Sequence, residues 1–377
     1  MNRMAILLML PLLFSCFFFP TRAEGEIETQ AKSVILMEAV TGKVLYEDNA
    51  DEPLPPASVT KIMTLLLVLE DLDAGKIKLS DTVSVSKRAA SMGGSQVYLE
   101  EGEQMSVDEL LKCVTVASAN DAAAALAEYV SGSLESFVAR MNKRAAELGM
   151  TRTHFENTNG LDDTTEDHLT TARDIATMSR ELLQHEQIFA YTNIWMDTVR
   201  NGAFSLTNTN RLIRFYKGAN GLKTGSTSKA GFCISATAKR DGMQLIAVVM
   251  ASPTRDERNG TAAKLLDYGF ANYEFYKAPA SETSELPVRA GKSESVGLSY
   301  PELSFVLPKG SGGKVEIVID MPETLVAPVG EGEAVGNMTC LLDGKQLGSG
   351  SIKAQNKVER LGVFDLFLKF LASYTPF

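Results

Sequence analysis

The sequence predicts a mixed α/β domain, a layered sheet with flanking helices, followed by a small all-β domain and a terminal amphipathic helix. Three observations support this fold class. Helical and strand-like patterns are interleaved from residue 26 to residue 276, which favours helices packed on a sheet. The composition then shifts toward Pro, Ser and Glu, and apolar residues alternate as in strands. Residues 357–377 form an apolar helical pattern.

Length and composition narrow the possible classes of protein. The chain has 377 residues, which at about 150 residues per domain corresponds to two domains. Hydrophobic residues make up 45% and charged residues 22%, which excludes a disordered or multi-span membrane protein. The formal net charge of −10 argues against a nucleic-acid partner. The three histidines (His154, His168 and His185) do not have an HExxH-type spacing, so we expect no metal site.

The N-terminus has the pattern of a secretory signal. Arg3 precedes an apolar run over Met4–Phe19 that Pro11 interrupts, and residues 1–23 end in the small residue Ala23. A retained membrane anchor is the alternative. The protein is therefore expected to be exported.

The cysteines that remain after residue 23 do not suggest a disulfide framework. Cys113, Cys233 and Cys340 are odd in number, and Cys113 and Cys233 lie in apolar stretches where they would pack as small hydrophobic side chains.

Residues 24–277 are predicted to form the first domain. Ser33–Glu38 and Val44–Glu47 have the pattern of two strands joined by a turn. Ser106 and Glu109 form a capping box, which starts a helix. The predicted helices are Ser58–Leu72, Ser106–Tyr129, Ser133–Leu148 and Thr261–Tyr276, and the predicted later strands are Lys229–Lys239 and Met243–Ala251.

Residues 285–355 are predicted to form a small sandwich-like β domain, after a linker-like entrance over residues 278–296. Lys314–Asp320 alternates apolar and polar residues as a half-buried strand does. Asp343-Gly344 lies between two strand-like runs, which is a strong hairpin signal.

Residues 357–377 are predicted to form an amphipathic membrane-anchor helix. Asp365 and Lys369 share one helical stripe, and Phe364, Phe367 and Leu368 face the other way. The charged residues interrupt the apolar length needed to span a bilayer, so the helix would lie in the membrane surface. The alternative is a helix docked on the β domain.

Ser58-Val59-Thr60-Lys61 is the first candidate for catalysis. Pro55-Pro56 fixes the backbone just before a buried apolar helix, and Lys61 lies one turn after Ser58 on the same face. A serine hydroxyl needs a neighbour that takes its proton, and a lysine in a dry pocket near a second cation can do so. The same Ser-x-x-Lys spacing occurs elsewhere in the chain, and the alternative is an ordinary helix cap with a solvated lysine.

Two further polar clusters complete the set of candidates. Ser118-Ala119-Asn120 interrupts two apolar helical runs, and its alternative interpretation is a cap. Lys223-Thr224-Gly225 follows Asn220-Gly221 in a strand where glycines allow close backbone approach. Its lysine and hydroxyl suit a carboxylate, and the alternative is an ordinary edge-strand lysine.

The order of these three motifs in one exported domain is more specific than any of them alone. The trio is typical of penicillin-binding proteins and class A β-lactamases. The sequence resembles the low-molecular-weight penicillin-binding proteins, which are serine-type D-alanyl-D-alanine carboxypeptidases. One departure is Ala119, where glycine is usual in the family. The resemblance covers nearly the whole chain and includes Thr41–Tyr46, Pro55–Ser58, Leu99–Glu103, Asp108–Leu111, Ser118–Ala122, Met141–Asn142, Leu148–Met150, Gly160–Leu161 and Thr171–Asp174.

The resemblance implies a β-lactamase/transpeptidase-like fold, with an antiparallel sheet flanked by helices, and removal of the terminal D-alanine from peptidoglycan stem peptides. It implies that β-lactams acylate the enzyme, that no metal or other cofactor is needed, and that the protein works on the outer face of a bacterial cytoplasmic membrane. The implied catalytic residues are Ser58 as nucleophile, Lys61 as base, Ser118 as proton relay and Asn120 as a holder of the substrate amide.

The resemblance also implies the substrate-binding residues, which are Lys223, Thr224, Gly225 and Ser226. Lys223 and Thr224 would bind the terminal carboxylate. The backbone N–H groups of Ser58 and Ser226 would form the oxyanion hole.

Three alternatives remain at this stage. A serine β-lactamase needs a carboxylate that activates water, and Glu156 lies in a plausible place, but the asparagine expected four residues later is Gly160. A non-catalytic penicillin-sensing or wall-binding module could keep the fold without the chemistry, but every polar motif position is present. A Cys113 nucleophile is disfavoured because its surroundings are apolar.

Overall fold

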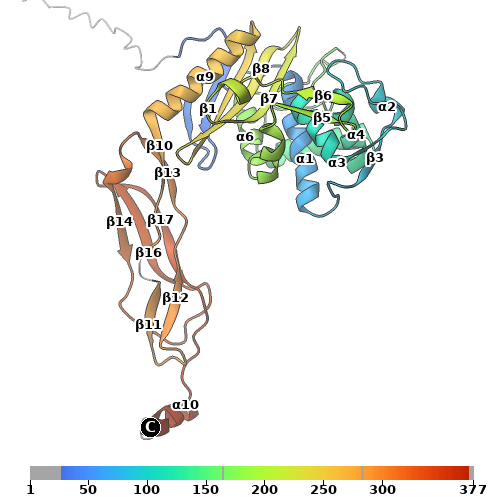
Figure 1. The fold of residues 1–377 in the computed structure, drawn as a ribbon. Helices are drawn as coiled ribbons and strands as arrows, with labels where there is room; N and C mark the ends of the chain where they lie inside the picture. The colour runs from blue at the N-terminus through green and yellow to red at the C-terminus, as the bar shows by residue number, and fades with distance from the viewer. Residues whose placement is uncertain (1–26, 164, 282–283, 373–377) are drawn as a thin grey trace, which may run out of the picture.

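The computed structural model describes residues 27–163, 165–281 and 284–372. The ribbon divides into a broad N-terminal head, residues 27–272, and a narrow C-terminal β unit, residues 273–360, with helix α10 at the far end (Figure 1). The predicted signal, residues 1–23, lies outside the described residues.

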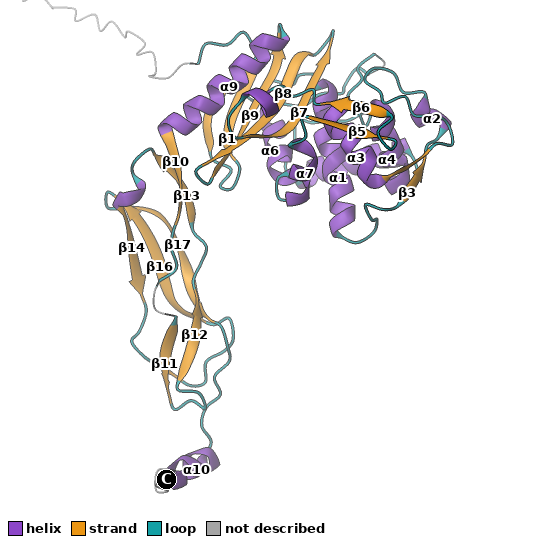
Figure 2. Cartoon of the chain, viewed as in Figure 1, coloured by secondary structure: helices purple, strands orange, loops and turns teal. Residues whose placement is uncertain are grey.

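The head is built on a five-stranded sheet in the order β2-β1-β9-β8-β7, in which all neighbours are antiparallel. Helices cover both faces (Figure 2). Successive residues of the apolar central strand β9 therefore alternate between two cores, with Ile246 and Val248 in one and Leu245 and Val249 in the other. The strands are β1 Ser33–Glu38, β2 Val44–Asp48, β7 Ala219–Thr227, β8 Gly231–Arg240 and β9 Met243–Ser252.

The strands predicted in the head are confirmed to within two residues at each end. The longer helices of the head are α1 Lys61–Asp73, α3 Val107–Lys112, α4 Asn120–Ser131, α5 Leu134–Glu147, α6 Ala172–Leu182 and α9 Arg255–Asn272. The short helices are α2 Lys87–Ala90, α7 Phe189–Thr192 and α8 Leu212–Phe215, and the short strands pair as β3 Thr82–Ser84 with β4 Gln104–Ser106 and β5 Met196–Val199 with β6 Phe204–Thr207.

The helix predicted over Ser106–Tyr129 is wrong as a single element. The predicted capping box at Ser106 and Glu109 starts α3. A π-helical turn at Cys113–Ala117 then ends at Ser118, whose φ of +61° is left-handed, and α4 begins at Asn120. The extra backbone of the π-turn and the left-handed residue break the helix where the polar cluster lies.

The helix predicted over Thr261–Tyr276 is also misplaced. The Thr254 hydroxyl accepts from the Glu257 N–H, so α9 begins at Arg255. The helix ends at Asn272 because the aromatic-rich segment Tyr273–Lys277 pairs as strand β10 with β13, Ser304–Pro308.

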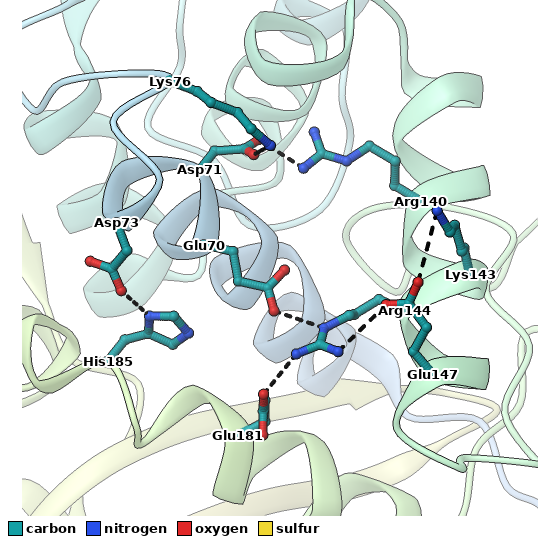
Figure 3. Close-up of polar contacts among 10 residues, drawn as sticks. All are labelled: Glu70, Asp71, Asp73, Lys76, Arg140, Lys143, Arg144, Glu147, Glu181 and His185. Carbon is teal, nitrogen blue, oxygen red and sulfur yellow. Dashed lines mark hydrogen bonds and ion pairs between the residues drawn. The ribbon is translucent and has the colours of Figure 1, made fainter. Parts of the chain in front are cut away.

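Ion pairs join the C-terminal end of α1 to α5, and α5 to α6 (Figure 3). Arg144 of α5 reaches Glu70 and Glu181 at 2.7 Å each, and Asp71 pairs with Arg140 of α5 at 2.8 Å. Two arginines of α5 therefore hold this end of α1, and Arg144 also links it to α6.

The C-terminal β unit contains a six-stranded sheet in the order β14-β16-β17-β12-β11-β15 beside the β10–β13 ribbon. The hairpin predicted at Asp343-Gly344 joins β16 and β17 and is confirmed. The linker predicted over residues 278–296 is wrong in part, because Glu285 already begins a strand. The six strands are β11 Glu285–Arg289, β12 Ser295–Ser299, β14 Val315–Asp320, β15 Leu325–Val326, β16 Ala334–Leu342 and β17 Lys345–Ala354.

Helix α10 covers Val363–Ala372 and presents apolar side chains to solvent. Val363 is 87% exposed and Phe364 is 71% exposed. None of the helices within the described ranges combines the length and apolar content that crossing a bilayer would need.

Candidate active site

Ser58 lies in a tight turn that leads into a buried helix. Pro55 and Pro56 precede a 3₁₀ turn over Ala57–Thr60, and α1 begins at Lys61. This arrangement places Lys61 Nζ 2.9 Å from Ser58 Oγ. The helix predicted from Ser58 is confirmed in place, with its first turn 3₁₀ rather than α.

Lys61 is fully buried, and its hydrogen-bond partners among the described residues are uncharged. Its Nζ donates to Asn120 Oδ1 at 2.6 Å and to the Asn159 carbonyl at 2.9 Å, and Ser58 Oγ is its third polar neighbour. Burial lowers the pKa of Lys61 well below its ordinary value, and the nearby Lys223 ammonium lowers this pKa further, against the opposing effect of Asp121. The site therefore favours the neutral amine.

Ser118 and Asn120 are presented by the break between the π-turn and α4. Ser118 Oγ accepts from Lys223 Nζ at 2.7 Å. Asn120 uses its carbonyl for Lys61 and donates its amide N–H to the Gly93 carbonyl at 2.7 Å. One short segment thus touches both buried lysines.

Strand β7 supplies the opposite side of the site. Lys223 is 1% exposed, and burial, with a smaller contribution from Arg258, lowers its pKa to about 7. Gly225 faces the nucleophile turn, since a Cβ there would lie 2.7 Å from Ser58 N. Only glycine allows the strand to approach this closely. Ser226, the next residue, is exposed.

The structure thus brings the predicted residues together from α1, the Ser118–Asn120 break and β7. It also adds contacts that the motifs did not indicate. Thr224 Oγ1 donates to Thr209 Oγ1 at 2.8 Å, and the Asn159 carbonyl completes the shell of Lys61. Neither contact could be predicted from the sequence, because any residue supplies a main-chain carbonyl and Thr209 is not part of a motif.

Glu156 and Cys113 are the residues on which the β-lactamase and cysteine-nucleophile alternatives depend. The Glu156 carboxylate accepts from the Asp167 N–H at 3.3 Å. Burial raises the pKa of the Cys113 thiol to about 12, which suppresses the thiolate a nucleophile needs. Within the described residues, no group of His, Cys, Asp and Glu side chains has the arrangement of a metal site.

Comparison with known proteins identifies the family of the chain. Residues 20–254 match the D-alanyl-D-alanine carboxypeptidase family model, and residues 270–360 match the C-terminal domain model of penicillin-binding protein 5. The chain belongs to the D-alanyl-D-alanine carboxypeptidases of the low-molecular-weight penicillin-binding proteins. The family and fold class expected from the sequence are confirmed.

Individual members of this family match over most of the chain. D-alanyl-D-alanine carboxypeptidase DacF of Bacillus subtilis is 43% identical, over 94% of this chain and 92% of its own length. Penicillin-binding protein 5 of Haemophilus influenzae superposes with a TM-score of 0.74 at 32% identity, over 89% of this chain and 99% of its own. Penicillin-binding protein D2 of Listeria monocytogenes, in an ampicillin-bound form, has a TM-score of 0.60 at 31% identity, over 65% of this chain and 99% of its own.

Proposed function

We propose that this D-alanyl-D-alanine carboxypeptidase works through an acyl-enzyme on Ser58, with Lys61 as the general base. The contacts of Lys61 carry this proposal. A neutral amine has two N–H donors and one lone pair. Asn120 Oδ1 and the Asn159 carbonyl can only accept, so they take both donors. The lone pair is then left for the Ser58 hydroxyl proton, 2.9 Å between the heavy atoms.

The substrate would be a peptidoglycan stem peptide with two terminal D-alanines. Ser58 Oγ attacks the carbonyl between them as its proton moves to Lys61. The backbone N–H groups of Ser58 and Ser226 stabilise the oxyanion, and the absence of a side chain on Gly225 keeps β7 close enough to the turn for both to reach it.

Lys223 would bind the terminal D-alanine, which is the leaving residue. Lys223 and Thr224 bind the terminal carboxylate, and we add Thr209, whose hydroxyl contacts that of Thr224. Ser118, hydrogen-bonded to Lys223, passes a proton to the leaving amine. Asn120 holds the substrate amide, which requires its side chain to exchange a present partner for the substrate.

Water then hydrolyses the acyl-enzyme and restores Ser58. β-Lactams would acylate the same oxygen and leave a long-lived adduct, whereas a β-lactamase would turn them over rapidly. The ampicillin-bound form of the Listeria relative supports β-lactam binding in this fold.

The test of the nucleophile is D-alanine release from a synthetic peptide ending in D-Ala-D-Ala. The wild-type chain should release D-alanine, and Ser58→Ala should release none above the uncatalysed rate. Undiminished release by Ser58→Ala would refute the assignment. A conservative control, Ser136→Ala, removes a hydroxyl in the exposed first turn of α5 and should leave the rate unchanged.

We further propose export and attachment to the outer face of the bacterial cytoplasmic membrane. Residues 1–23 would be the cleaved signal, residues 24–277 the enzyme domain and residues 285–355 the β domain. Residues 357–377 would lie in the membrane surface. The apolar face of α10 is exposed, and its burial in lipid would lower the free energy.

A further inference from the structure

A buried histidine that the mechanism does not use lies directly behind the nucleophile turn. His168 is 3% exposed and packs edge-on against the Phe155 ring. Its Nδ1 lies 2.9 Å from the Glu156 N–H group, and its Nε2 lies 2.8 Å from Thr60 Oγ1. The imidazole thus bridges the loop before it and the turn that carries Ser58.

These contacts fix the direction of each hydrogen bond in the series that runs from Glu156 through His168 and Thr60 to Ala57. A backbone N–H can only donate, so Nδ1 is the unprotonated nitrogen and Nε2 carries the proton that goes to Thr60. Burial lowers the pKa of His168 to about 4, which keeps the ring neutral at neutral pH. Thr60, itself fully buried, donates a hydrogen bond from its hydroxyl to the Ala57 carbonyl at 2.8 Å.

The Ala57 carbonyl is the other half of the peptide group that bears the Ser58 N–H. The peptide group is planar and trans, so its C=O and N–H point in opposite directions, and anchoring one aims the other. The Ser58 nitrogen faces β7, because a Cβ on Gly225 would lie 2.7 Å from it. On the opposite side, a Cβ on Gly160 would lie 1.8 Å from the Ala57 oxygen, so the loop closes directly on this carbonyl.

The backbone at Ala57 needs such an anchor. Its φ is +48°, a left-handed value that is uncommon for a residue with a side chain. The hydrogen bond from Thr60 holds the carbonyl in that conformation.

We propose that His168 and Thr60 are positioning residues that aim the Ser58 N–H into the oxyanion hole. His168 orients the Thr60 hydroxyl, Thr60 holds the Ala57 carbonyl, and the carbonyl sets the direction of the N–H. This inference rests on the proposed function, which gives the Ser58 N–H its role as an oxyanion donor.

The test uses two substitutions of His168 that separate the links. Gln can reach Thr60 from the position of Nε2 but loses the acceptor for Glu156, whereas Asn keeps that acceptor and loses Thr60. The rate constant for acylation by benzylpenicillin should fall about 10- to 100-fold in His168→Asn and stay within about 3-fold in His168→Gln. Loss of an oxyanion donor costs about 10²–10³-fold, so a misaimed donor should cost less.

Thr60 supplies an independent pair of variants. Thr60→Val keeps the shape of the side chain and should lower the acylation rate constant as His168→Asn does, whereas Thr60→Ser should not. The double variant His168→Asn/Thr60→Val should be no slower than Thr60→Val, because both changes interrupt the same series of hydrogen bonds. The dissociation constant of the complex formed before acylation should stay within about 2-fold in all of them.

The outcomes separate this inference from the proposed function. Wild-type protein that forms no adduct at Ser58 would refute the proposed function itself. An acylated wild type with a fully active His168→Asn or Thr60→Val, or with His168→Gln slower than His168→Asn, would refute only the positioning role. If His168→Asn does not fold, as judged by thermal unfolding, Thr60→Val against Thr60→Ser decides the question.

Discussion

The two ends of helix α1 differ in the partners of their ionisable side chains. At the first residue, Lys61 is fully buried, and its Nζ lies within hydrogen-bond distance of a hydroxyl, a side-chain amide oxygen and a main-chain carbonyl. At the last turns, carboxylates meet cations: Glu70 pairs with Arg144, and Asp71 pairs with both Arg140 and Lys76 (Figure 3). One helix thus carries an amine without a paired carboxylate and a fully paired acidic cluster.

This difference separates a reactive end from a structural one. Burial without a counter-ion costs several kcal/mol for a charged amine, and the group relieves that cost by giving up its proton. Paired charges have a counter-ion instead, and a partly exposed pair such as Glu70 with Arg144 contributes about 0.2–1 kcal/mol. We therefore assign the buried amine at the start of α1 to the proposed catalysis and the ion pairs at its end to helix packing.

The largest expected effect is at Lys61. Lys61→Met keeps the apolar stem and removes the base, so the acylation rate constant with benzylpenicillin should fall about 10³-fold or more. The thermal midpoint should stay equal or rise, because an apolar side chain replaces a buried amine. Stopped-flow acylation and calorimetry measure the two quantities. An acylation rate within 10-fold of wild type would break the comparison between the two ends.

The pH dependence of kcat/KM should reflect both buried lysines. Below the lowered pKa of Lys61 the amine is protonated and cannot accept the Ser58 proton, so kcat/KM rises as pH rises through that pKa. Above about 7 the free enzyme loses the charge of Lys223 that attracts the substrate carboxylate, so kcat/KM then falls about 10-fold per pH unit. Steady-state kinetics on a D-Ala-D-Ala peptide would show this, and a kcat/KM that keeps rising to pH 9 would contradict the role of Lys223.

The opposite end of α1 gives a smaller, purely structural effect. Asp71→Asn removes the charge that Arg140 and Lys76 share, and should lower the free energy of unfolding by about 1–3 kcal/mol. Acylation should stay within 2-fold of wild type. Denaturant unfolding measures the first quantity, and a loss of acylation in folded Asp71→Asn would show that the two ends are coupled.

The smallest effect on catalysis is expected from the far end of the molecule. Truncation after Arg360 removes α10 and should leave kcat within about 2-fold, while binding to anionic lipid vesicles is lost. Sedimentation with vesicles and peptide hydrolysis measure the two. Vesicle binding that survives the truncation would place the membrane contact elsewhere.

The side chains of the site were largely predictable from the sequence, because each lies in a short local motif. Ser58 and Lys61 are one turn apart on a helix, and Lys223 lies between two glycines of a strand. Ser118-Ala119-Asn120 interrupts an apolar run and so indicates a break, although the helical pattern on both sides predicts one helix across it.

Other parts of the site were not predictable, for physical reasons. The Asn159 carbonyl is a main-chain group, and any residue there would supply it. Thr209 and His168 act through contacts between segments far apart in the chain, and their positions carry no periodic pattern. Gly160 belongs to the family resemblance and stands where a β-lactamase would have asparagine, but neither observation indicates the space that it leaves beside Ala57.

The pairing of Ser58 with a neutral Lys61 is tested most directly by mapping the benzylpenicillin adduct by peptide mass spectrometry. The account predicts one penicilloyl group on the peptide that contains Ser58, no adduct in Ser58→Ala, and a greatly slowed adduct in Lys61→Met. An adduct on another residue, or one formed at the wild-type rate in Lys61→Met, would contradict it.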